Sequence, residues 1–258
     1  MDLGLKDRVA FVAGSSRGIG KAIAAAFLAE GCRTVVTGRT AETLRSTAAG
    51  LEQQFTPDHV MAVVGDLTDL TVIRKMLAQV RERWGGVDCA VANIGTGSGK
   101  PGWNIGEDDW NRAFDMNLWA TVRLVTELLP AMTAHKNGSI VIISSIAGIE
   151  STAAPAPYGV AKAALVHYAK TIARQVGSYN VRINCIAPGN ILFAGGSWDR
   201  HIATSPAKVA DYIRTEVPLQ RFGKPEEVAD AVVFLSSDRA SFITGACLIA
   251  DGGQTRRA

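Results

Sequence analysis

Short apolar segments alternate with longer amphipathic segments along the chain. The apolar segments have the length of strands and are hydrophobic on both faces, as in a parallel sheet that is covered on both sides. The longer segments repeat their apolar residues at helical spacing. The pattern predicts strands at Val9–Ala13, Thr34–Thr37, Val60–Val64, Val87–Ala92, Ser139–Ser144, Val181–Ile186 and Ala246–Ala250, and helices at Gly18–Glu30, Ala41–Gln54, Leu70–Trp84, Glu107–Met132, after Pro157 and near Pro225–Ser236. We therefore expect an α/β fold, with helices on both faces of one parallel sheet.

No linker, low-complexity run or charge block divides the sequence, so a single domain over residues 1–258 is predicted. About 47% of the residues are hydrophobic, which is enough for one sizeable core. The formal net charge of +3 is spread along the chain without a basic cluster, so nucleic acid is not an expected partner. No apolar stretch approaches the roughly 20 residues that span a bilayer, so a membrane is not expected either.

The cysteines and histidines do not form a recognisable metal or disulfide pattern. The four cysteines are far apart, without a Cys-x-x-Cys pair, and are interpreted as small buried hydrophobic residues in a reducing compartment. We therefore expect a cytoplasmic protein. The four histidines show no metal-ligand spacing, and no protein metal site is expected.

A glycine-rich turn lies between the first predicted strand and the helix that follows it. Glycines in such a turn bend the chain tightly and let the backbone approach a pyrophosphate, while the start of the helix supplies free N–H groups and partial positive charge. The turn predicts phosphate contacts from Gly14, Ser16, Arg17, Gly18, Ile19 and Gly20.

Tyr158 and Lys162 lie four residues apart in the first turns of a predicted helix, which places both side chains on one helix face. A lysine within roughly 4–6 Å of a phenol stabilises the phenolate and lowers its pKa from about 10. The pair is therefore a candidate acid/base centre.

Several further motifs occur in a fixed order. Ser145 precedes Tyr158 by thirteen residues, Asn117 lies in the long predicted helix, and the fourth strand ends at Asn93-Ile94-Gly95. Ala187-Pro188-Gly189, residues 223–229 and Asp251-Gly252-Gly253 follow. Together with the glycine-rich turn, these motifs resemble the short-chain dehydrogenase/reductase family along almost the whole chain, and its 3-oxoacyl thioester reductases in particular. The resemblance implies a seven-stranded Rossmann sheet and hydride transfer between a nicotinamide cofactor and a carbonyl or alcohol.

The resemblance also implies a role for each catalytic candidate. Tyr158 would exchange a proton with the substrate oxygen, and Ser145 would hydrogen-bond the same oxygen. Lys162 would lower the pKa of Tyr158 and hydrogen-bond the nicotinamide ribose. Asn117 would hold a water for proton relay through Lys162.

The residues after the second strand bear on the choice of cofactor. NAD-preferring relatives usually carry an acidic residue there, and this chain has Gly38 at that position, followed by Arg39. Arg39 and Arg17 could both reach a 2′-phosphate, so NADP(H) is favoured over NAD(H). By resemblance, further cofactor contacts are expected from Asp66, Leu67, Asn93, Gly95, Tyr158, Lys162, Pro188, Gly189 and Ile191.

One position departs from the family pattern. Relatives commonly have a threonine shortly after Pro188-Gly189, where this chain has Phe193. The backbone of Ile191 could still hold the carboxamide. We expect a substrate loop at about 190–216, in which Phe193 and Trp198 either cover a substrate or pack beneath the loop.

Three functions remain open from the sequence. The leading interpretation is an NADPH-dependent carbonyl reductase similar to 3-oxoacyl thioester reductases. The alternatives are an NAD(P)-dependent dehydrogenase of a secondary alcohol, sugar or steroid, and a cofactor-sensing protein without turnover.

The helix Glu107–Met132 carries more apolar surface than its own sheet would bury, and in the family such helices pair across a two-fold axis. We therefore expect the chain to form a homo-oligomer, with a tetramer as the expected size.

Overall fold

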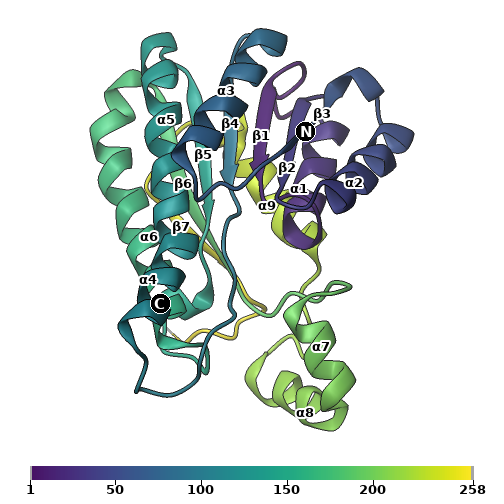
Figure 1. The fold of residues 1–258 in the computed structure, drawn as a ribbon, viewed down its shortest axis with the longest axis vertical. Helices are drawn as coiled ribbons and strands as arrows, with labels where there is room; N and C mark the ends of the chain where they lie inside the picture. The colour runs from purple at the N-terminus through teal and green to yellow at the C-terminus, as the bar shows by residue number, and fades with distance from the viewer. Residues whose placement is uncertain (1, 257–258) are drawn as a thin grey trace.

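Seven apolar segments lie side by side and form one parallel sheet in the computed structural model, which describes residues 2–256 (Figure 1). The strand order is β3-β2-β1-β4-β5-β6-β7, so the order reverses between β1 and β4. The strands are β1 (Val9–Ala13), β2 (Arg33–Gly38), β3 (Val60–Val64), β4 (Cys89–Ala92), β5 (Gly138–Ile143), β6 (Val181–Pro188) and β7 (Cys247–Ala250). This arrangement confirms the predicted seven-stranded α/β fold.

Helices cover both faces of the sheet. They are α1 (Gly18–Ala29), α2 (Ala41–Gln54), α3 (Leu70–Trp84), α4 (Glu107–Phe114), α5 (Ala120–His135), α6 (Ala156–Val176), α7 (Ser197–Thr204), α8 (Pro206–Glu216) and α9 (Pro225–Ser236). Buried residues of α1, α2 and α9 pack on one face, and those of α3, α5 and α6 pack on the other. The helices α7 and α8 stand apart, beyond the carboxyl ends of the strands (Figure 1).

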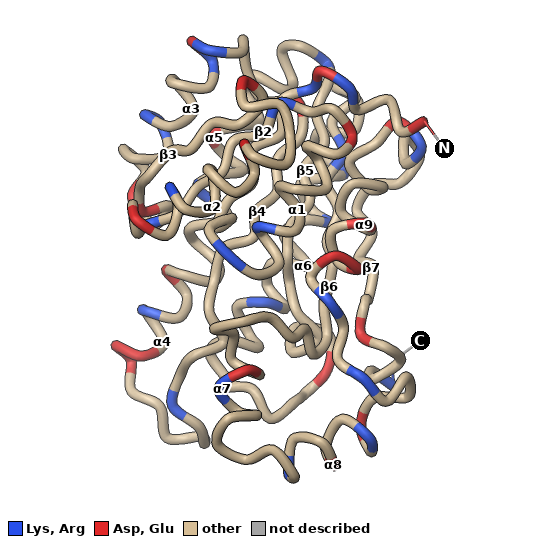
Figure 2. Tube along the Cα trace, turned by 90° about the vertical axis from the view of Figure 1, so that its right-hand side faces the viewer, with Lys and Arg blue, Asp and Glu red and all other residues tan. Residues whose placement is uncertain are grey.

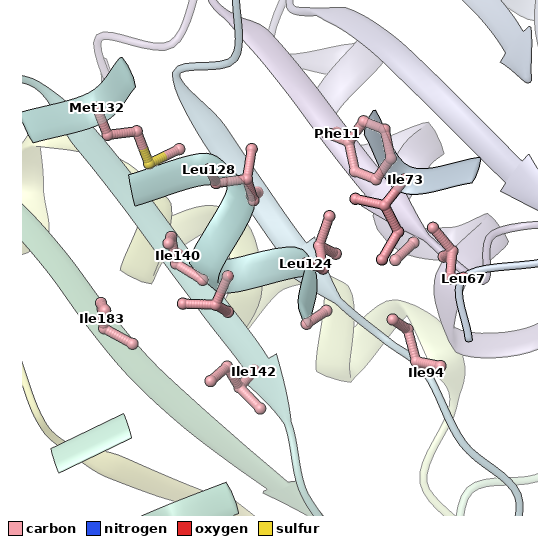
Figure 3. Packing of buried hydrophobic residues seen from close by; sticks show 14 of the residues in the cluster. Phe11, Leu67, Ile73, Ile94, Leu124, Leu128, Met132, Ile140, Ile142 and Ile183 are labelled. Atoms are coloured by element: carbon pink, nitrogen blue, oxygen red, sulfur yellow. The ribbon is translucent and has the colours of Figure 1, made fainter. Parts of the chain in front are cut away.

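The side chains of each strand alternate between two apolar layers. In β1, Phe11 packs with α3 and α5, whereas its neighbour Val12 packs with α1 and α9. Figure 3 shows part of the first layer, to which Leu124 of α5 and Ile142 of β5 both belong, and Leu124 is fully buried. This alternation explains why most positions of the strands are apolar, since both faces of the sheet are covered.

Two regions differ from the predicted elements. The long helix expected over Glu107–Met132 is interrupted by a π-helical turn at Asp115–Trp119, and it continues through Pro130 to His135. The expected loop at 190–216 contains the helices α7 and α8, whose apolar residues Val209 and Ile213 form a small separate cluster with Val217. Both segments were too short or too irregular for the periodicity to define.

The charged residues are interspersed along the chain, with both signs present on most parts of the molecule (Figure 2). Among the described residues, no helix combines the length and apolar character that crossing a membrane requires. Cys32, Cys89 and Cys185 are buried, and Cys247 is half-buried because β7 is an edge strand. Within residues 2–256, no group of three or more metal-ligating side chains is placed to hold a metal ion.

Candidate active site

The glycine-rich turn joins the carboxyl end of β1 to the first turn of α1. Gly14 and Gly18 have φ angles of 63° and 55°, which favour glycine. A Cβ at Gly20 would lie 2.6 Å from Nδ2 of Asn93 and would also collide with the carbonyl oxygen of Gly14. Asn93 itself donates to that carbonyl at 2.9 Å, so the end of β4 fixes the shape of the turn.

The first turn of α1 is open to an anion. No side chain caps its N-terminus, so the N–H groups of the first helical residues Gly18, Ile19 and Gly20 are not satisfied by a capping group. Ser16 is anchored beside the turn, because its carbonyl oxygen accepts a hydrogen bond from Thr47 at 2.7 Å. Free N–H groups at a helix N-terminus suit a phosphate, so the turn fits the pyrophosphate of a dinucleotide.

The two arginines proposed for cofactor choice occupy different surroundings. Arg39 follows β2, is exposed, and has no hydrogen-bond partner among the described residues. Gly38 lies against Ser16, so that a Cβ at position 38 would be only 3.0 Å from the Ser16 Cβ. Arg17 instead donates from Nη1 to the carbonyl oxygen of Gly195 at 3.1 Å.

Three catalytic candidates meet at the carboxyl edge of the sheet. Ser145 follows β5, and its hydroxyl accepts the N–H of Ala147 at 3.2 Å as a short 3₁₀ turn begins. Tyr158 lies in the first turn of α6, where Pro157 occupies an early helical position. The hydroxyl of Ser145 is placed to interact with that of Tyr158, and this interaction acts to lower the pKa of the phenol. A substrate oxygen placed between them could contact both groups.

Lys162 lies one turn further along α6 and is almost fully buried, with 3% exposure. Its Nζ donates to the carbonyl oxygens of Ile143 at 2.9 Å and Ile94 at 3.2 Å. The same Nζ is 5.9 Å from the centroid of the Tyr158 ring. The predicted pair therefore does share one helix face, and the ammonium is held at the ends of β4 and β5.

The pKa shifts in this pair differ from the expectation. Burial raises the pKa of Tyr158, and its hydrogen bond with Ser145 offsets only part of that effect. Burial also lowers the pKa of Lys162 to about 8. The prediction that Lys162 lowers the pKa of Tyr158 is wrong for this structure, because desolvation of the phenol dominates and the ammonium points to two carbonyl oxygens.

Asn117 lies in the π-helical turn between α4 and α5 and is 1% exposed. Its Nδ2 donates to the carbonyl oxygen of Ala113 at 2.9 Å, and its Oδ1 accepts the N–H of Thr96 at 2.8 Å. A Cβ at Gly95 would collide with Oδ1 of Asn117 and would lie 3.2 Å from Nζ of Lys162. Asn117 and Lys162 therefore both lie next to Gly95. The proton relay expected between them would need this proximity.

The remaining predicted cofactor residues line the same edge of the sheet. Asp66 accepts two hydrogen bonds from Thr68, each at 2.9 Å, while the side chain of Leu67 is buried in the core. Pro188 ends β6, and a Cβ at Gly189 would be 2.8 Å from Cα of Asp251. Ile191 pairs through its backbone with Gly223.

A cavity of about 540 Å³ borders this region and is lined by Ile191, Val217, Leu219 and Ile249 among others. None of the four catalytic candidates lines it. It is therefore separate from the place where Ser145 and Tyr158 meet.

The aromatic residues of the expected substrate loop contact protein neighbours. The ring of Trp198 stacks on Tyr212 and tilts against Phe222, with centroid distances of 5.4 Å in both cases. The ring of Phe193 packs on the glycine-rich turn, since a Cβ at Gly18 would lie 2.6 Å from it. Contact of either ring with a substrate stays a prediction.

Sequence reasoning missed some residues that shape the site. Thr96 orients Asn117 through its backbone N–H, and its hydroxyl donates to Ser98 at 3.0 Å. Gln254 joins Asn190 to the phenol of Tyr212, with both hydrogen bonds at 2.7 Å. Thr96 directly follows the Asn93-Ile94-Gly95 motif, and this position in the sequence could have identified it as a site residue. Nothing local to the sequence linked Gln254 to α8.

Comparisons with known proteins agree with this geometry. Residues 13–255 match the family model described as enoyl-(acyl carrier protein) reductase. The chain is 32% identical to the 3-oxoacyl-[acyl-carrier-protein] reductase FabG of Thermotoga maritima over 249 residues, which cover 96% of this chain and 98% of that protein.

Two solved structures superpose over the full length of both chains. The L-sorbose reductase of Gluconobacter frateurii, solved with NADPH and L-sorbose, has a TM-score of 0.90 and 34% identity. A putative gluconate dehydrogenase of Agrobacterium tumefaciens has a TM-score of 0.92 and 28% identity.

Proposed function

The chain belongs to the short-chain dehydrogenase/reductase family of NAD(P)-dependent oxidoreductases, and we propose that it is an NADPH-dependent carbonyl reductase. The observation that carries the proposal is the meeting of Ser145, Tyr158 and Lys162 at the carboxyl edge of the sheet, beside a turn that fits a pyrophosphate. Because burial raises the pKa of Tyr158, the phenol keeps its proton at neutral pH. A protonated phenol is the form that reduction of a carbonyl requires.

The reaction combines a hydride and a proton. A bound reduced nicotinamide supplies the hydride to the carbonyl carbon of the substrate. Tyr158 donates its proton to the carbonyl oxygen, so that the ketone becomes a secondary alcohol. The hydroxyl of Ser145 hydrogen-bonds the same oxygen and stabilises the negative charge that develops on it.

Lys162 and Asn117 support this proton transfer. An ammonium has three donors, and two of those on Lys162 are directed at the carbonyl oxygens of Ile94 and Ile143. The third is free to hydrogen-bond the nicotinamide ribose. After transfer, the Tyr158 phenolate recovers a proton through a relay that passes Lys162 and a water held near Asn117.

The residues expected at the adenosine end of the cofactor favour NADPH over NADH. Arg39 directly follows β2, is exposed and has no partner within residues 2–256, so its guanidinium can bind a 2′-phosphate. A Cβ at position 38 would lie 3.0 Å from the Ser16 Cβ, so the acidic side chain that would bind the ribose hydroxyls of NAD would require Ser16 to shift. NADPH in the solved L-sorbose reductase supports the same choice.

The substrate class has two candidates. The 32% identity to a 3-oxoacyl-[acyl-carrier-protein] reductase supports a 3-oxoacyl thioester. A hydroxylated ketone is supported by the L-sorbose reductase structure and by the hydroxyls of Thr96 and Ser98, which lie on the segment that passes Tyr158 at Gly97. We take the thioester as the first candidate and the hydroxylated ketone as the second.

We also propose a homo-oligomer, as a tetramer in the reducing cytoplasm. Trp119 at the start of α5 is 49% exposed and Val160 of α6 is 48% exposed, and both lie on the long helices that carry the catalytic residues. Phe242, in the segment that leads to the edge strand β7, is fully exposed, and Leu248 of β7 is 42% exposed. Apolar surface of this kind favours association of identical chains.

A reductase assay tests the proposal. Acetoacetyl-coenzyme A and L-sorbose are each supplied with NADPH and with NADH, and the absorbance of the reduced nicotinamide is followed. We expect oxidation of NADPH with one of the two substrates. Tyr158→Phe keeps the ring but removes the proton, so turnover should nearly vanish while NADPH binding persists. Turnover by Tyr158→Phe at the wild-type rate would refute the mechanism.

A further inference from the structure

Two arginines from distant parts of the chain converge on one backbone carbonyl. Nη1 of Arg17 lies 3.1 Å from the carbonyl oxygen of Gly195, and Nη1 of Arg200 lies 3.0 Å from the same oxygen. The two cationic groups are therefore no more than about 6 Å apart at these nitrogens. Asp199 accepts the N–H of Gly195 at 2.8 Å, but no described carboxylate forms an ion pair with either guanidinium.

This cluster lies beside the glycine-rich turn. Arg17 is the residue that precedes α1, and Gly195 follows Phe193, whose ring packs directly on Gly18. The two guanidinium groups thus stand next to the uncapped start of α1, where the pyrophosphate fits. The side chain of Phe193 offers no hydrogen bond to a phosphate, whereas the two arginines bring charged donors to this side of the turn.

We propose that Arg200, together with Arg17, binds the pyrophosphate of the nicotinamide cofactor. The assignment rests on the cofactor binding stated above. Two like charges repel each other at this separation, and a pyrophosphate with a negative charge on each phosphate relieves the repulsion. Each guanidinium uses one donor on Gly195 and retains further donors in a planar fork that matches phosphate oxygens.

The position of Arg200 on α7 gives this contact a second consequence. The helices α7 and α8 pack on each other through the cluster of Val209, Trp198 and Tyr212, so they behave as one unit. Gly195 has a φ of 73° and lies at the base of that unit, next to Gly196. Binding of the cofactor through Arg200 would therefore hold α7 and α8 in place beside the glycine-rich turn.

Binding measurements test the assignment without relying on turnover. The affinities of NADPH and NADH are measured by fluorescence titration for the wild type and for Arg200→Gln. Loss of a charged hydrogen bond is expected to weaken both cofactors by about tenfold or more and by the same factor, because both carry the pyrophosphate. Arg200→Lys keeps the charge and should recover part of the affinity. Hydrogen exchange in α7 and α8 should slow on NADPH addition in the wild type but not in Arg200→Gln.

Arg214→Gln is the matched control, since Arg214 is an exposed arginine of α8 paired with Asp211. It should leave both affinities unchanged. Unchanged affinities in Arg200→Gln would overturn the assignment, and a loss confined to NADPH would assign Arg200 to the 2′-phosphate instead. Failure of the wild type to bind either cofactor would refute the proposed function itself, which separates the two conclusions.

Discussion

Lys162 is a buried charge, and its protonation is linked to the free energy of unfolding. Burial lowers its pKa from 10.5 to about 8. Each pKa unit corresponds to about 1.4 kcal/mol, so keeping the ammonium charged in the folded protein at neutral pH costs about 3 kcal/mol. Lys162→Met removes this charge while keeping an unbranched side chain of similar length.

The direction of the pH dependence follows from the lowered pKa. The unfolded chain binds more protons than the folded chain between about pH 8 and about pH 10.5, so the stability of the wild type rises with pH in that window. Below about pH 8 the full cost is present, and above about pH 10.5 it is gone. From about pH 7 to about pH 10, we expect the wild type to gain about 2–3 kcal/mol relative to Lys162→Met.

Urea unfolding of both proteins at several pH values, at equal protomer concentration, measures this difference. The variant also leaves the carbonyl oxygens of Ile94 and Ile143 without their donor. That loss lowers its free energy of unfolding by the same amount at every pH, so it does not change the slope of stability against pH. Lys208→Met, at an exposed position of α8, is the control and should follow the wild type. Parallel curves for the wild type and Lys162→Met would refute the reasoning.

Two further predictions concern the cofactor and the assembly. Arg39→Ala should weaken NADPH binding by about 1.5–3 kcal/mol and affect NADH little, because it removes one charged contact to the 2′-phosphate. Titration of both cofactors checks this, with Arg214→Ala as the control, and equal losses for both would mean that Arg39 does not contact the phosphate. Trp119 is 49% exposed in the single chain, so Trp119→Glu places a charge on the proposed interface between chains. The mass measured by light scattering should therefore fall from that of an oligomer toward the 27.3 kDa chain mass. A fully active wild-type species already at that mass would contradict the assembly and its coupling to catalysis.

The strands were predictable because the physical signal is strong. A strand covered on both faces favours apolar residues throughout, so β1 at Val9–Ala13 was located with the observed bounds. The edge strand β3 at Val60–Val64 was also located with the observed bounds, because it is apolar although partly exposed. The glycine-rich turn was also predictable, since positive φ angles at Gly14 and Gly18 leave few alternatives to glycine. In both cases the local sequence and the tertiary structure impose the same requirement.

Other features depend on contacts that no local pattern encodes. The π-helical turn at Asn117 shifts the hydrogen-bond register without changing the apolar spacing around it, so the sequence predicted one continuous helix. The pKa of Tyr158 depends on the balance between burial and the interaction with Ser145, and only the structure gives both. The partner of Arg17, the carbonyl oxygen of Gly195, lies 178 residues further along the chain.

Gly95 shows how these distant features combine in the site. Its φ of 138° is unfavourable for other residues, and a side chain there would collide with Asn117 and press on Nζ of Lys162. Directly before it, the carbonyl oxygen of Ile94 accepts a hydrogen bond from Lys162, and directly after it the N–H of Thr96 donates to Asn117. Three consecutive residues after β4 thus set the separation between the buried ammonium and the buried amide. The separation that the proposed proton relay must bridge is therefore fixed by backbone at a strand end, and a search for polar side chains alone would not reveal it.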